Sequence, residues 1–105
     1  MGLDQRDIRD RLEEVRGRTS LDLLGIADVR QARRKFLELT APVSEKLAFA
    51  IVIAVRISPT VLDTLTDGPN LLYYHHYRQL NFHLDRAASR MARESERMGH
   101  AALQI

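Results

Sequence analysis

The chain contains no cysteine among its 105 residues. It therefore has no thiolate for a disulfide, for nucleophilic catalysis or for ligating an iron–sulfur cluster. Long apolar runs are also lacking, because the longest one, residues 47–55, is too short to span a bilayer as a helix. The charged stretch 4–18 has no apolar segment typical of a signal peptide. We therefore expect a cytoplasmic protein with no membrane association.

The chain also has no large excess of charges of one sign. It contains 16 Lys and Arg residues and 14 Asp and Glu residues, for a net charge of +2. Arginine outnumbers lysine by 14 to 2, but carboxylates are mixed among the arginines. A nucleic-acid surface usually presents a stripe of positive charge, so this mixing argues against a nucleic-acid partner. The length and the ordinary apolar content predict one domain, 1–105, with a modest core.

The first part of the chain predicts one helix and one strand. Apolar residues at i, i+4 and i+7 predict an amphipathic helix over 4–16 that ends at Gly17. The short apolar segment 21–27 predicts a strand. The basic segment 29–39 fits a short helix or a surface loop, and its positive charges suit phosphate less well than a solvated face. The apolar residues of the helix are Ile8, Leu12 and Val15.

The apolar stretch 47–57 is the clearest predicted strand. It has no polar alternation and is rich in Ile and Val, which is typical of a strand buried on both faces. A buried helix is the competing interpretation, since periodicity alone does not separate the two. Ser58 followed by Pro59 predicts an N-cap and the first position of a short helix that ends near Leu65.

The last part of the chain predicts a long helix over 71–98, capped by Asn70 and stopped by Gly99. The alternation in 100–105 predicts a half-buried strand. The predicted fold class is therefore α+β, with a few-stranded sheet covered by the N-terminal helix and the long helix. So few strands for so apolar a sequence predict a partial domain of a larger fold, or a homodimer that covers the open sheet.

Aromatic residues are scarce, yet all three tyrosines fall within five positions of the long helix. Tyr73 and Tyr77 share the expected buried side, so we predict that they pack in the core and that Tyr77 is buried. Three other residues of this helix are our candidates for contact with a cofactor or a partner. These candidates are Tyr74, His75 and Asn81, and we expect Asn81 to lie among buried neighbours.

The titratable side chains of this helix predict neither a metal site nor a catalytic group. His76 and His83 are seven residues apart, whereas helical zinc ligands usually lie three or four apart. Asp85 is expected to pair with Arg78 or Arg86. No Ser-His-Asp order and no pair of carboxylates indicates an active site. We therefore predict no metal and no catalytic residue in this chain.

From residue 22 onward, the order of several short motifs resembles the N-terminal region of the epoxyqueuosine reductase-like iron–sulfur proteins, which are related to corrinoid-dependent reductive dehalogenases. The resemblance covers most of the chain. The motifs that carry it are Leu23-Leu24-Gly25-Ile26-Ala27-Asp28, Ile51-Val52-Ile53, Ser58-Pro59-Thr60-Val61-Leu62-Asp63, Asp67-Gly68-Pro69, Tyr74-His75-His76-Tyr77-Arg78-Gln79-Leu80-Asn81, Leu84-Asp85-Arg86-Ala87-Ala88 and Gly99-His100-Ala101-Ala102-Leu103-Gln104-Ile105.

This resemblance implies a cobalamin-binding α+β domain that, in full-length members, precedes a ferredoxin-like part with two [4Fe–4S] clusters. The chain departs from those members because it lacks the cysteine-rich part and the region that carries the catalytic acid. The expected function is a non-catalytic N-terminal module that contributes at most part of a corrinoid site. The alternative is a small self-associating interaction protein with no cofactor, and a third, less favoured class is a stand-alone enzyme.

Overall fold

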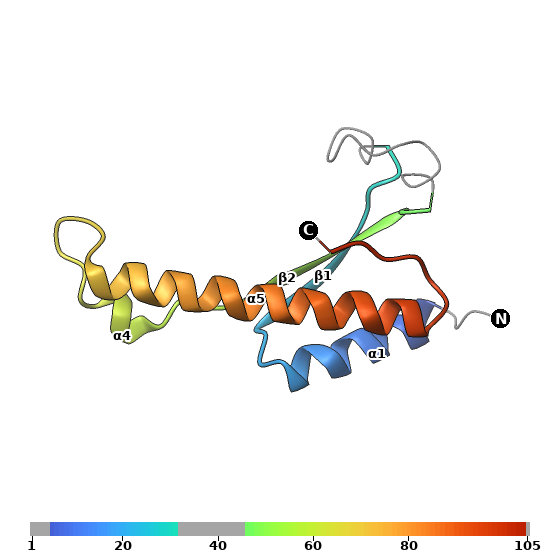
Figure 1. Ribbon diagram of the computed structural model, residues 1–105, viewed down its shortest axis with the longest axis horizontal. Helices are drawn as coiled ribbons and strands as arrows, with labels where there is room; N and C mark the ends of the chain where they lie inside the picture. Colours follow the sequence, from blue (N-terminus) through green and yellow to red (C-terminus); the bar gives the residue numbers. More distant parts are fainter. Residues whose placement is uncertain (1–4, 32–45, 105) are drawn as a thin grey trace.

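The structure is a computed structural model and describes residues 5–31 and 46–104. Figure 1 shows α1 lying along the C-terminal half of the long helix α5, with a two-stranded ribbon crossing them and the N-terminal half of α5 projecting past α1. The architecture is the small α+β fold that the sequence predicts. Its elements in chain order are α1 (Gln5–Arg18), β1 (Leu23–Asp28), β2 (Phe49–Ala54), α4 (Pro59–Leu62) and α5 (Leu71–Arg97).

Helix α1 continues through Gly17 and ends at Arg18, two residues later than predicted. The left-handed residue that closes it is Ser20, with φ of 56°. The N–H of Leu21 donates to the carbonyl of Arg16 at 3.2 Å, and the N–H of Ser20 donates to the carbonyl of Gly17 at 3.5 Å. This pair of bonds is a Schellman motif, which satisfies the free carbonyls of the last turn. The prediction that Gly17 ends the helix is therefore wrong.

Strands β1 and β2 pair antiparallel, with Leu24 opposite Ile53 and Ile26 opposite Ile51. Residues opposite each other point to the same face of an antiparallel sheet. Leu24, Ile51 and Ile53 pack against the core, so this is the inner face. The outer face stays uncovered in the described part of the chain, and Val52 on it is 57% exposed. The prediction that this strand is buried on both faces is wrong, because the described part of the chain covers the sheet on one side only.

The core lies between α1, the C-terminal half of α5 and the inner face of the sheet. Leu12, on the predicted apolar stripe of α1, is only 1% exposed, and Ala87 and Met91 of α5 are 1% and 3% exposed. The predicted buried side of α1 is confirmed. The residues that form the core cluster are Leu12, Val15, Leu21, Ala87, Met91 and Met98.

Both ends of α5 form as their local sequence predicts. The side chain of Asn70 accepts from the N–H of Tyr73 at 2.8 Å, which makes it the N-cap. Gly99 has φ of 89°, a left-handed conformation that glycine adopts without strain. Its N–H donates to the carbonyl of Glu96, and the N–H of His100 donates to the carbonyl of Ser95. The helix therefore ends in a second Schellman motif.

The strand predicted over 100–105 does not form in residues 100–104, the part of it that the structure describes. Leu103, which was expected to face the protein, is 50% exposed, whereas Ala102 is half-buried. The segment is instead attached to α5 through Gln104, whose side-chain amide donates to the carbonyl of Asp85 at 2.8 Å. A strand needs the backbone of a neighbouring strand, and this side-chain contact does not supply one.

Candidate functional site

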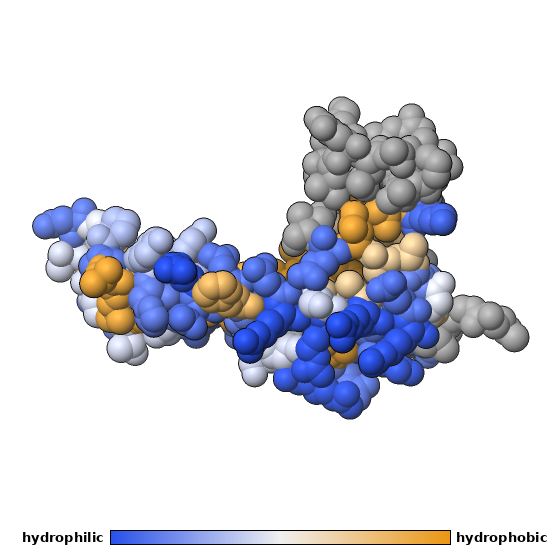
Figure 2. All heavy atoms as spheres, in the orientation of Figure 1, coloured by the Kyte–Doolittle hydropathy of each residue, from blue (hydrophilic) through white to orange (hydrophobic). Residues whose placement is uncertain are grey.

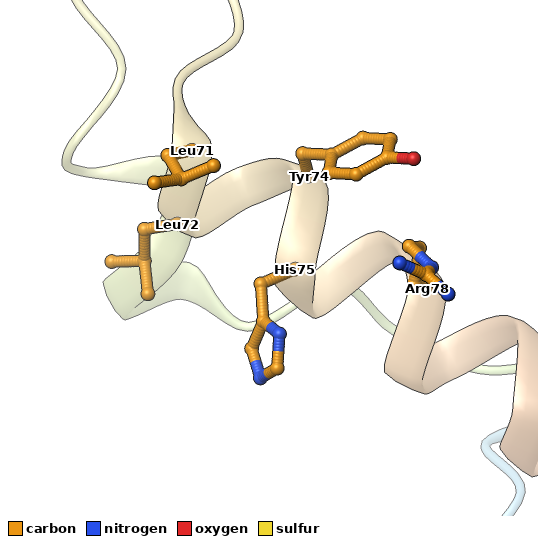
Figure 3. Close-up of a pocket in the computed structure, with 5 residues that line it drawn as sticks. All are labelled: Leu71, Leu72, Tyr74, His75 and Arg78. Atoms are coloured by element: carbon orange, nitrogen blue, oxygen red, sulfur yellow. The ribbon is translucent and has the colours of Figure 1, made fainter.

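The aromatic segment of α5 lies on the projecting half of the helix, beyond the end of α1 (Figure 1). Its first two turns bound a shallow depression that is open to solvent, drawn in Figure 3. Tyr74 and His75, two of the predicted contact residues, both border it. The lining residues are Leu71, Leu72, Tyr74, His75 and Arg78.

The side chains around this depression diverge instead of converging on one point. Figure 3 shows Tyr74 and Arg78 extending along one side of the helix, while His75 points away from them. The guanidinium carbon of Arg78 lies 5.9 Å from the centre of the Tyr74 ring, within range of a cation–π interaction. Tyr74 remains 56% exposed. The depression offers a binding surface, not an enclosed pocket.

Asn81 belongs to the same solvent-facing side of α5 as Tyr74, since the two are seven residues apart. Its side chain is exposed, and its amide donates to the carbonyl of Tyr77 at 3.1 Å, one turn earlier. The expectation that Asn81 lies among buried neighbours is therefore wrong. Tyr74 shares a helix face with Asn81 and borders the depression together with His75, whereas Asn81 is not among the residues that line the depression.

Tyr73 and Tyr77 stack on each other with ring centres 6.4 Å apart and an interplanar angle of 25°. Tyr73 is half-buried, but Tyr77 is 53% exposed. The prediction that Tyr77 is buried is wrong. Helical spacing correctly placed it towards the side of α5 that carries the core residues, but α1 does not extend far enough to cover this part of the helix (Figure 1).

His76 has a structural role that the sequence did not reveal. Its Nε2 accepts a hydrogen bond from the backbone N–H of Ser58 at 3.0 Å. The same Ser58 caps α4, since its hydroxyl accepts from the N–H of Val61, as the Ser-Pro pair predicted. His76 therefore ties the start of α4 to α5. One signal was available in the sequence: His76 has no metal-ligating partner at helical spacing, which favours a hydrogen-bonding role.

At the far end of the sheet, Arg30 donates to the Asp28 carboxylate through its backbone N–H, its Nε and its Nη2, with Nε 3.0 Å from each carboxylate oxygen. The side-chain hydrogen bonding, followed by the charge of Asp28, raises the pKa of the Arg30 guanidinium above its ordinary value. The guanidinium carbon also lies 5.8 Å from the Phe49 ring centre. Arg30 is thus held by its own chain, which disfavours the phosphate interpretation for it. The remainder of that basic run, 32–35, lies outside the described residues.

Residues 5–31 and 46–104 contain no group of three His, Cys, Asp or Glu side chains close enough to hold a metal ion. Within the same ranges, no ion pair joins Asp85 to Arg78 or Arg86, so the expected pairing does not form there. No helix among the described residues is long and apolar enough to cross a membrane.

Comparison of the chain with family models, with curated proteins and with solved structures gave no match. The resemblance to the epoxyqueuosine reductase-like proteins therefore stays a prediction that depends on the motifs and their order.

Proposed function

We propose that this chain is a non-catalytic module that docks onto further protein through the outer face of its sheet. The observation that carries the proposal is the composition of that face. Leu23 and Val52 on it are 67% and 57% exposed. Its other members are small, and it has no polar side chain. The outer-face residues, from their pairing, are Leu23, Gly25, Ala27, Ala50, Val52 and Ala54.

An antiparallel sheet that faces water on one side normally alternates apolar and polar residues. Here the outer face is apolar as well, although the core packs only against Leu24, Ile51 and Ile53 of the inner face. Among residues 5–31 and 46–104 the sheet has two strands and both of its edges are unpaired. A pair of strands gains stability when further strands or another layer join it. These features support a role in which another protein layer packs on the outer face and extends the sheet.

The motif order supports a more specific form of this role, the N-terminal module of an epoxyqueuosine reductase-like protein. In such a protein the covering layer is the remainder of the corrinoid-binding domain. Tyr74, His75 and Asn81 fit cobalamin only in part, because Tyr74 and His75 diverge at the border of an open depression that Asn81 does not line. This chain then contributes at most one wall of a corrinoid site. The protein that completes the domain supplies the chemistry.

A second candidate function is self-association without a cofactor. It is favoured by a separate observation, an uncovered stripe of aromatic, apolar and charged residues along α5. Leu71 at its start is 82% exposed. Under this candidate the chain acts as a small interaction protein.

The dye 8-anilinonaphthalene-1-sulfonate, which fluoresces on apolar protein surface, tests whether the outer face is available to another protein. We expect the native chain to bind the dye, and the double variant Leu23→Thr/Val52→Thr to lose most of that signal. Leu62→Thr removes an exposed leucine of α4, away from the sheet, and is the matched control. Equal dye binding by the native chain and the double variant would overturn the docking proposal.

Titration with hydroxocobalamin, followed by visible absorbance, tests the corrinoid part separately. A saturable spectral change that weakens in Tyr74→Ala and in Asn81→Ala supports a partial corrinoid site. A native chain that causes no change at about 100 μM cobalamin, a concentration at which even weak sites of millimolar affinity begin to fill, would remove the corrinoid part. The docking role would then remain.

A further inference from the structure

One side of α5 carries a second row of large side chains, opposite the buried Ala87 and Met91. We call it the outer stripe. Its members are spaced three or four residues apart, so they follow one face of the helix. Figure 2 shows apolar patches interrupting the hydrophilic surface of the projecting half of α5. The outer stripe consists of Leu71, Tyr74, Arg78, Phe82 and Asp85.

The outer stripe is open to solvent along its length. Leu71, Tyr74 and Phe82 are 82%, 56% and 54% exposed, and Arg78 and Asp85 are exposed as well. The side of a helix that faces solvent normally carries polar residues, because apolar side chains stabilise a protein only when they are removed from water. Three large apolar or aromatic side chains on this side indicate a surface that packs against something.

The outer stripe also carries one cation and one anion that do not pair with each other. Arg78 and Asp85 lie seven residues apart, which separates them by about 10 Å along the helix axis, too far for an ion pair. In the described part of the chain, neither has an ion-pair partner. The guanidinium of Arg78 lies over the face of Tyr74. The stripe therefore presents a positive and a negative charge, each available to another molecule.

We propose that the occupant of the outer stripe is a second copy of this chain, with the two α5 helices packed antiparallel. A two-fold axis beside Phe82 brings Arg78 of each copy opposite Asp85 of the other. The same axis places the two Phe82 rings against each other at the centre. A two-fold interface is self-complementary, and this stripe satisfies that requirement because its two charges exchange places under the rotation.

The size of the side chains fits the same arrangement. Under this axis, Tyr74 of one copy faces Ser89 of the other, and Leu71 faces Ala92. The large residues at the N-terminal end of the stripe thus meet small residues further along α5. The helix segment that these facing pairs cover, from 71 to 92, is roughly 30 Å long at 1.5 Å per residue. An unrelated partner would need this charge order and this size order by coincidence, whereas a second copy has both.

The proposed dimer uses a different surface from the sheet docking and does not depend on cobalamin. Sedimentation equilibrium of the whole chain between about 1 and 200 μM, the range in which interfaces of modest area typically dissociate, measures it directly. We expect a reversible monomer–dimer equilibrium in the native chain. Arg78→Glu and Asp85→Arg should each weaken dimerisation at least tenfold, because each single change places two pairs of like charges across the interface.

Charge exchange gives the decisive result. The double variant Arg78→Glu/Asp85→Arg restores opposite charges and should dimerise as the native chain does. An equimolar mixture of the two single variants should form a heterodimer for the same reason. Arg90→Glu, an exposed arginine of α5 off the stripe, is the matched control and should leave dimerisation unchanged.

Three outcomes would overturn the proposal. They are a native chain that stays monomeric throughout this range, single variants that dimerise as well as the native chain, and failure of both the double variant and the mixture to recover. Circular dichroism of each variant verifies that α5 is intact. Intact helices with weakened dimerisation in the single variants and recovery in the mixture would support the antiparallel pairing.

Discussion

At the scale of single residues, His75 and His76 are neighbours in sequence with different roles. His75 is exposed at the edge of an open depression. His76 is half-buried and accepts the N–H of Ser58. Accepting that bond requires an unprotonated Nε2, so the ring hydrogen of the neutral imidazole resides on Nδ1. The pair provides a native comparison between a histidine that links two elements and one that does not.

We predict that His76→Ala releases the start of α4. The N–H of Ser58 should exchange with deuterium faster, and the free energy of unfolding should fall by about 1 kcal/mol, typical of one lost hydrogen bond. His75→Ala should change neither the exchange rate nor the stability by more than about 0.5 kcal/mol. Exchange measured by mass spectrometry and urea melts of both variants provide the comparison. Equal protection of Ser58 in the two variants would show that this bond does not hold α4.

Tyr77 and Leu12 allow a second prediction, because the first is half-exposed and the second is 1% exposed. Leu12→Ala should lower the free energy of unfolding by about 2–5 kcal/mol, as for leucines in cores. Tyr77→Ala should cost about 1 kcal/mol, mainly through the lost stacking on Tyr73. Urea melts measure both. A Tyr77→Ala variant that unfolds more easily than Leu12→Ala would mean that Tyr77 is buried in solution.

The residues that the sequence predicted correctly are mostly those whose role is set within one turn of the chain. Ser58 and Asn70 cap helices because a side-chain oxygen reaches an N–H three residues ahead, and Gly99 ends α5 through its own backbone freedom. Tyr77 and Asn81 were predicted wrongly because helical spacing gives the direction of a side chain but not what lies opposite it. Distant segments decide that.

At the scale of elements, α1 shows how tertiary packing overrides a local signal. Gly17 alone predicts the end of the helix. The chain nevertheless continues as a helix past Gly17, and Leu21, which is 3% exposed, packs in the core after the turn. The turn that places Leu21 there falls on Ser20. The predicted strand 100–105 failed for a related reason. Its alternation over a few residues fits an extended tail as well as a strand, and only an available strand edge distinguishes them.

We predict that Ser20→Gly stabilises the protein by about 0.5–1 kcal/mol, because it removes the steric cost of a left-handed non-glycine residue. Gly99→Ser, which introduces that cost at the end of α5, should destabilise by a similar amount. Thermal unfolding of the two variants measures both effects. A Ser20→Gly variant no more stable than the native protein would mean that the end of α1 differs in solution from the structure.

At the scale of the whole molecule, the chain is extended for its length. Its radius of gyration is 16.4 Å, against about 13 Å for a compact domain of 100 residues. The N-terminal half of α5 projects beyond the core, which lies between α1 and the C-terminal half of α5 (Figure 1). The outer face of the sheet points away from this core. The α+β class followed from apolar patterns within the sequence. An open sheet was expected from the small number of strands, but the sequence did not reveal which surfaces stay uncovered, because that depends on how the elements pack together.

This open architecture leads to the last prediction, that the isolated chain catalyses no reduction. A reductase of the family it resembles needs a reservoir of electrons, an enclosed corrinoid and a proton donor at the substrate. Here the sequence has no cysteine for a cluster, and the depression beside Tyr74 and His75 is open. With cobalamin, a chemical reductant and epoxyqueuosine-containing RNA, product should form no faster than without protein. A full-length member of the family, assayed in parallel, verifies the assay. Turnover above the protein-free rate, lost in Tyr74→Ala, would show that these residues complete a site without another protein layer.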